Sequence, residues 1–129
     1  MLYYIKKEDY FTRPYVGVSS ILYFCDQPVT IEECQQAVDK VLSDKIRKIC
    51  FVGQFSAEVK ETLESVCIDL FEEGGEPFEF ILDEKDLVEG CECWALSCYD
   101  LERYNTNLVV YEDENEKLIA QREVELTDI

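Results

Sequence analysis

The sequence predicts one α/β domain over residues 1–129, with a β-α-β-α-β core, a mixed sheet and a C-terminal antiparallel β-hairpin. Three observations predict it. Strand-like apolar runs alternate with amphipathic helical patterns over the first two-thirds of the chain, which favours a mainly parallel sheet covered by helices. The last third changes to short strand-like segments joined by polar stretches. No linker rich in proline, serine or glycine and no internal repeat divides the 129 residues, so a single domain is expected.

The first half of the chain contains a strand, a helix and a second strand. The strand-like run covers residues 15–25 and ends just before a proline, which cannot donate a ladder hydrogen bond. A helix over about 31–43 follows, because Thr30 and Glu33 have capping-box spacing and apolar residues then recur on one helical face. Residues 45–53 carry a continuous apolar run, which is typical of a central strand buried on both faces.

A second helix and a third strand complete the predicted core. Ser56 can cap a helix whose apolar stripe continues toward Gly74 and Gly75, where the helix is expected to end. Residues 77–82 have the composition of the next strand.

The C-terminal third is predicted to be mainly β-structure. Residues 94–99, 107–111 and 117–126 are strand-like, and the acidic stretch 112–116 separates the last two. The economical interpretation is an antiparallel hairpin with 112–116 at its tip. Residues 117–126 also fit helical spacing, so a short helix is the alternative for that segment.

The seven cysteines include one tight cluster, formed by Cys91, Cys93 and Cys98. Zinc sites normally use two C-x₂₋₄-C pairs, and redox sites use C-x-x-C or a basic neighbour that lowers the thiol pKa. The cluster matches neither pattern. The sequence therefore predicts a cysteine-rich loop that leads into a strand, with cysteines packing as small apolar residues in a reducing compartment.

The composition excludes several classes of function. The chain has no histidine, which removes Ser-His-Asp and Cys-His nucleophile schemes. The first residues lack the order of a signal peptide and no apolar run reaches the length of a membrane span, so a cytoplasmic protein is expected. With 12 Lys and Arg against 29 Asp and Glu, the net charge of −17 argues against binding nucleic acid or an anionic membrane. No catalytic, cofactor-binding or metal-binding residue is assigned.

The negative charge is confined to the second part of the chain. Residues 1–57 contain seven acids and seven bases, whereas residues 58–129 contain 22 acids and five bases and so hold the whole charge of −17. One interpretation is a solvated acidic face. The other is a surface complementary to a cationic protein, with tyrosines as desolvated anchors, whereas Trp94 is expected in the core. The partner-binding residues would then be Glu58, Glu61, Glu64, Asp83, Glu84, Asp86, Glu89, Tyr99, Tyr104, Glu112, Asp113 and Glu114.

Three acid-rich segments, 58–76, 83–92 and 112–125, thus occur in a small single domain without a catalytic constellation. In these features the chain resembles bacterial immunity proteins, the antidotes of contact-dependent inhibition and polymorphic toxin systems. The resemblance implies a cytoplasmic protein that binds a basic toxin domain, a nuclease, in a 1:1 complex and covers its active site or substrate groove. It lies in the profile of the whole chain, so no functional residue is carried over position by position.

Three other functions stay open. The chain could be a regulatory or assembly module that binds a basic protein without inhibiting it, a phage-encoded mimic of nucleic acid, or a small enzyme. A tight complex that weakens with salt would favour the inhibitor, whereas a deep pocket with converging polar groups would favour the enzyme.

Overall fold

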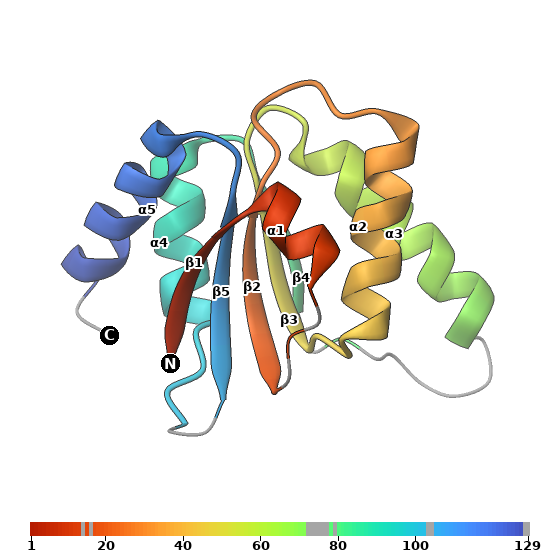
Figure 1. Cartoon of the computed structure of the whole chain (residues 1–129), viewed down its shortest axis with the longest axis horizontal. Coiled ribbons are helices and arrows are strands. Elements are labelled where there is room, and N and C mark those ends of the chain that lie inside the picture. The colour runs from red at the N-terminus through yellow and green to blue at the C-terminus, as the bar shows by residue number, and fades with distance from the viewer. Residues whose placement is uncertain (14, 16, 72–77, 79, 103–104, 128–129) are drawn as a thin grey trace.

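The computed structural model describes residues 1–13, 15, 17–71, 78, 80–102 and 105–127, and strands alternate with helices along the chain (Figure 1). The strands are β1 (Leu2–Lys6), β2 (Val18–Phe24), β3 (Lys48–Val52), β4 (Phe80–Glu84) and β5 (Thr106–Tyr111). The helices are α1 (Lys7–Thr12), α2 (Ile31–Ser43), α3 (Ser56–Phe71), α4 (Leu87–Ser97) and α5 (Glu114–Leu126). The first strand and the first helix lie in a segment to which the sequence pattern assigned no element.

The five strands form one sheet in the order β1-β5-β2-β3-β4, and every neighbouring pair is parallel. The last strand of the chain, β5, lies between β1 and β2, so that Val109 pairs with Tyr4 on one side and with Leu22 on the other. The α/β class is confirmed. The expected mixed sheet with a C-terminal antiparallel hairpin is wrong, because β5 enters a parallel sheet and a helix follows it.

The C-terminal third differs from its prediction because two helices there begin with polar residues that also suit turns. The predicted strand 94–99 lies in and just after α4, so the cysteine-rich segment is helical. Residues 117–126 belong to α5, which is the alternative that helical spacing allowed. The predicted hairpin tip is instead a helix start: Asp113 accepts a hydrogen bond from the Glu116 backbone N–H at 2.9 Å, and the Glu116 side chain accepts from the Asp113 N–H in return.

The predictions for the first two-thirds of the chain are confirmed at the level of elements. The helix expected over 31–43 has these bounds in the structure, and Thr30 Oγ1 accepts a hydrogen bond from the Glu33 N–H at 3.1 Å. The next helix was expected to have Ser56 as its cap, but Ser56 is its first helical residue and the buried Ser56 Oγ has no hydrogen-bond partner among the described residues, so the predicted cap is wrong. The predicted end of this helix at residues 74–75 lies outside the described residues. The third predicted strand is β4, which ends two residues beyond the predicted limit.

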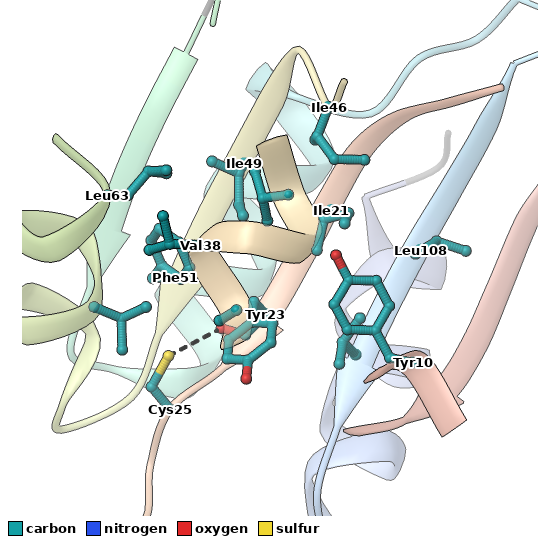
Figure 2. Packing of buried hydrophobic residues seen from close by; sticks show 14 of the residues in the cluster. Tyr10, Ile21, Tyr23, Cys25, Val38, Ile46, Ile49, Phe51, Leu63 and Leu108 are labelled. Atoms are coloured by element: carbon teal, nitrogen blue, oxygen red, sulfur yellow. Dashed lines mark hydrogen bonds between the residues drawn. The ribbon is translucent and has the colours of Figure 1, made fainter. Parts of the chain in front are cut away.

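Helices cover both faces of the sheet, with α1, α2 and α3 on one face and α4 and α5 on the other (Figure 1). Alternate residues of a strand point to opposite faces, so Ile21 and Tyr23 join the first apolar cluster while Leu22 and Phe24 join the second. Figure 2 shows the first cluster, in which Tyr10 of α1 lies beside Tyr23 with 6.4 Å between ring centroids. All seven residues of β2 are buried, which explains its nearly continuous apolar sequence.

Candidate functional site at the carboxyl edge of the sheet

The parallel topology brings the carboxyl ends of all five strands and the N-termini of all five helices to one edge of the sheet, uppermost in Figure 1. We call the stretches from the last residue of each strand to the fourth residue of the next helix the acidic edge. They contain 13 acids and four lysines, a formal net charge of −9. The acids are Glu8, Asp9, Asp26, Glu32, Glu33, Glu58, Glu84, Asp86, Glu89, Glu112, Asp113, Glu114 and Glu116. The lysines are Lys6, Lys7, Lys85 and Lys117.

The acidic edge unites part of the set that the sequence predicted to bind a partner. Glu61 and Glu64 continue along α3 away from this edge. Asp83 lies inside β4, where its carboxylate pairs with the Lys60 ammonium at 3.2 Å. The predicted residues that do belong to the acidic edge are Glu58, Glu84, Asp86, Glu89, Glu112, Asp113 and Glu114.

Of the two predicted tyrosine anchors, the one that the structure describes does not join these acids. Tyr99 follows the C-terminus of α4, at the opposite edge of the sheet, and packs edge-to-face on Trp94 with 5.5 Å between ring centroids. Trp94 is fully buried, as expected. Tyr104 lies outside the described residues. Glu61, Glu64, Asp83 and Tyr99 therefore lie apart from the seven predicted residues at the acidic edge.

Six acids of this edge are absent from the predicted set: Glu116, which is buried, and five acids that belong to the part of the chain whose total charge is zero. The five are Glu8, Asp9, Asp26, Glu32 and Glu33. Each follows a strand directly or lies in the first turn of the next helix. A position just after a strand can be recognised in the sequence. It indicates that these acids share one edge with the others only if the whole sheet is assumed to be parallel.

Some carboxylates at this edge have structural roles in starting helices. Asp86 and Asp113 cap α4 and α5, and Asp26 Oδ1 accepts a hydrogen bond from the Gln54 N–H at 3.1 Å. First-turn acids are also stabilised by the helix dipole. Other exposed first-turn side chains accept no hydrogen bond from the described residues, namely Glu32, Glu58, Glu89 and Glu114. Capping therefore accounts for only part of the charge.

Lys7 is a buried lysine of the acidic edge and joins three elements. Its side chain is 7% exposed, and its Nζ lies 3.5 Å from carboxylate oxygens of both Glu33 and Glu112. The Nζ also lies 4.9 Å from the centre of the Tyr23 ring. Because none of the described residues forms a hydrogen bond with this buried Nζ, the two ion pairs and the Tyr23 ring hold it by charge rather than by directed bonds. Lys7 thus ties α1 to α2 and to the end of β5, and solvent does not reach its amine.

Neighbouring buried groups are equally unsuited to nucleophilic chemistry. Burial raises the pKa of the Cys25 thiol far above its usual value, although Lys7 opposes the shift, so the thiol is neutral at pH 7. Burial also raises the pKa of the Glu116 carboxyl, against the backbone hydrogen bonds that it accepts from Glu112 at 2.7 Å and Asp113 at 3.3 Å. These groups hold the edge in shape rather than present a reactive atom.

The acidic edge disperses its carboxylates instead of converging them. In the part of the chain that the structure describes, no three Cys, Asp or Glu side chains are arranged to hold a metal ion. The cysteine cluster is spread along α4 and its C-cap: Cys91 in the helix and Cys98 at the cap are buried, and Cys93 is partly buried. A dispersed field of this kind suits several separate cationic side chains better than one ion.

A scan against protein-family models finds no match for this chain, and searches of curated proteins and of solved structures find none either. Within the described residues, no helix is both long enough and apolar enough to cross a membrane. Function is therefore inferred from the acidic edge itself.

Proposed function

We propose that the protein is an immunity-type inhibitor whose acidic edge binds a basic toxin domain, a nuclease, in a 1:1 complex and neutralises it. The observation that carries this proposal is the gathering of 13 acids and four lysines at one edge of the parallel sheet. The same edge is where ligands bind in most open α/β sheets, outside the carboxyl ends of the strands.

The charge of this edge selects the class of ligand. Helix N-termini ordinarily attract phosphate and other anions. Here carboxylates stand at the starts of all five helices, so an anionic ligand would meet repulsion at every approach. Lysine and arginine side chains of a nuclease, which normally hold nucleic-acid phosphates, would instead be attracted and oriented.

The competing interpretation is a solvated acidic face with no partner. Capping by Asp86 and Asp113 supports that view for two residues. Capping does not explain the exposed Glu32, Glu58 and Glu114; the helix dipole stabilises each of them locally, but their charges also repel one another within one edge. A cationic partner would relieve this repulsion, and the energy released would favour complex formation.

The test compares two charge-reversal variants of equal net charge. The edge variant carries Glu58→Lys, Glu89→Lys and Glu114→Lys, three exposed residues on three different helices that cap nothing. The control variant reverses three exposed acids away from the edge, Glu61, Glu64 and Glu125. The partner is the basic protein that co-purifies in a salt-sensitive 1:1 complex from the native cell, or the product of the adjoining upstream gene. Association rates are measured at about 0.05 and 0.5 M salt.

We expect the edge variant to associate about tenfold or more slowly at low salt, and the control to change little, because steering depends on local charge. We also expect an equimolar amount of the wild-type protein to abolish the partner's nuclease activity. Equal losses in the two variants would remove the acidic edge from the interface. A complex that forms while the nuclease stays active would refute inhibition and favour a regulatory module.

A further inference from the structure

α1 is too short to cover its share of the sheet. Its six residues span about 9 Å, whereas the five residues of β1 extend over about 16 Å. Figure 1 shows α2 and α3 over the part of this face that lies beyond β2, so α1 is the described helix nearest to β1. Part of β1 and β5 is therefore left without a helix on the face that carries α1.

A groove of about 620 Å³ lies in this place, between α1 and the margin of the sheet. Ile5 packs on the first apolar cluster, and Tyr3 points to the same face because alternate residues of a strand do so. Thr106 of β5 lies on this face for the same reason. The opposite wall is formed by α1 and the residues that follow it, namely Asp9, Arg13 and Tyr15. Side chains from three segments of the chain thus line one hollow.

The size and lining of the groove are those of a small-ligand site. Ligand pockets have volumes of about 300–1,000 Å³ and are lined mainly by apolar and aromatic side chains with a few polar groups. Here Ile5 provides apolar surface, and Tyr3, which is 47% exposed, provides an accessible ring. Tyr15 stacks on Tyr10 with 6.1 Å between ring centroids, which supports its ring from within. The ring of a ligand can pack against these aromatic groups.

The groove has a different charge from the rest of the molecule. Its ionisable lining residues with charge at neutral pH are Lys6, Asp9 and Arg13, a formal charge of +1 in a chain of net charge −17. Among the described residues, no carboxylate forms an ion pair with Arg13. Burial raises the pKa of Tyr15 and Arg13 opposes that shift, so the guanidinium lies near the Tyr15 hydroxyl. Arg13 is therefore available to an anionic group at the aromatic wall.

We propose that this groove binds a small aromatic carboxylate, whose ring packs against Tyr3 and Tyr15 and whose carboxylate accepts hydrogen bonds from Arg13. A single negative charge suits a lining of charge +1, whereas a dianionic phosphate would meet stronger repulsion from a chain of net charge −17. Asp9 lies one helical turn before Arg13 and repels the same carboxylate, which limits the affinity. The proposal involves no partner protein, so it does not depend on the inhibitor function proposed above.

The experiment titrates the isotope-labelled full chain with naphthoate and follows the backbone amide shifts by NMR. Naphthylmethylamine and naphthylmethanol carry the same ring with a positive charge and with no charge. Arg13→Gln removes the guanidinium, and Arg122→Gln on α5 is its matched control, since Arg122 is exposed and lies outside the groove. Asp9→Asn removes the opposing charge, and Asp39→Asn on α2 is its control. The far-UV circular dichroism of each variant confirms that it is folded.

We expect naphthoate to bind with a Kd of about 1 mM or lower, as suits a ligand of this size. The amides of Tyr3, Ile5 and Thr106 should shift, naphthylmethanol should bind more weakly, and naphthylmethylamine should bind most weakly. Tyr3→Ala should weaken the binding of naphthoate and of naphthylmethanol by the same factor of about three, because both ligands carry the ring.

The charge variants should change affinity in opposite directions. Arg13→Gln should weaken naphthoate binding about tenfold, and Arg122→Gln should leave it unchanged. Asp9→Asn should strengthen it about twofold at low salt, and Asp39→Asn should leave it unchanged. Absence of shifts at several millimolar naphthoate, a preference for naphthylmethylamine, shifts confined to residues outside the groove, or equal losses in Arg13→Gln and Arg122→Gln would each overturn the proposal.

Discussion

Gly90 is the position at which α4 lies closest to the sheet, and Gly90→Ala tests that packing. A Cβ added there would lie 2.2 Å from Val52 Cγ2 and 2.9 Å from Val52 Cβ, far inside van der Waals contact. Alanine in place of a helical glycine would gain about 1 kcal/mol from backbone preference. Overpacking of a close-packed interior costs roughly 1–3 kcal/mol or more, and so deep an overlap belongs at the upper end. We expect Gly90→Ala to lower the free energy of unfolding by about 2 kcal/mol.

The partner substitution Val52→Ala removes the Cγ2 atom that the new methyl group would meet. Alone, it deletes two buried methyl groups and costs about 2 kcal/mol, counting transfer and cavity terms together. In the double variant the added methyl group occupies part of the vacated space. The double variant should therefore be about as stable as Val52→Ala alone, which corresponds to a favourable coupling of about 2 kcal/mol.

Urea unfolding followed by circular dichroism and by the fluorescence of the buried Trp94 measures these free energies. The control pairs Gly90→Ala with Val109→Ala, a buried valine of the same apolar cluster that is not among the atoms nearest Gly90. That pair should be additive within about 0.5 kcal/mol. Additivity in the Gly90 and Val52 pair would refute the close approach of α4 to β3.

Three further predictions concern the helix start of α5, alkaline pH and a turn. Glu116→Ala should lower the free energy of unfolding in urea by about 1–2 kcal/mol, because two backbone N–H groups lose their acceptor. Glu116→Gln keeps an acceptor oxygen and should lower it less. Equal losses of stability in the two variants would contradict the capping role of Glu116. Burial raises the pKa of both Cys91 and Tyr4 to about 12, so in alkaline solution the folded state retains protons that the unfolded state releases. The free energy of unfolding should therefore be constant near pH 7 and fall as the pH rises from about 9 toward 12. A flat urea midpoint between pH 8 and 11 would be inconsistent with this burial. Gly53→Ala should lower the free energy of unfolding by about 3 kcal/mol or more, because φ is +121° at this residue and a Cβ would lie 2.5 Å from the Asp26 backbone N. An unchanged melting temperature would exclude this geometry.

The elements that the sequence predicted correctly are those with a local signal at their ends. Thr30 with Glu33 places the start of α2, and Ser56 marks the start of α3 to within one residue although its side chain does not cap that helix. Capping-box spacing also occurs at Asp113 and Glu116, but the charged run around them suits a turn as well and so favours a hairpin. The wrong sheet type follows from predicting a hairpin there.

The candidate site was less predictable than the fold, because it depends on contacts between distant parts of the chain. Glu58, Glu89 and Glu114 were predicted from charge density alone, and the parallel sheet places all three at one edge. Asp26 and Glu33 join them only through the sheet, since local charge in the first half of the chain is balanced. No local pattern could indicate that Lys7 is buried between α2 and the end of β5.

The central place of β5 sets the order in which the sheet can close during protein synthesis. Among the described strands β1 pairs with β5 alone, through bonds such as that between Met1 and Asn107, so it lacks this strand partner until almost all of the 129 residues have been made. At about 5–20 residues per second, the ribosome needs roughly 5–20 s to reach β5 after completing β1. During that interval β1 and one side of β2 remain open to mispairing, as edge strands are. Because β5 pairs with both β1 and β2, the sheet is complete only after this last strand has been added. The two ends of the polypeptide therefore fold as one cooperative unit.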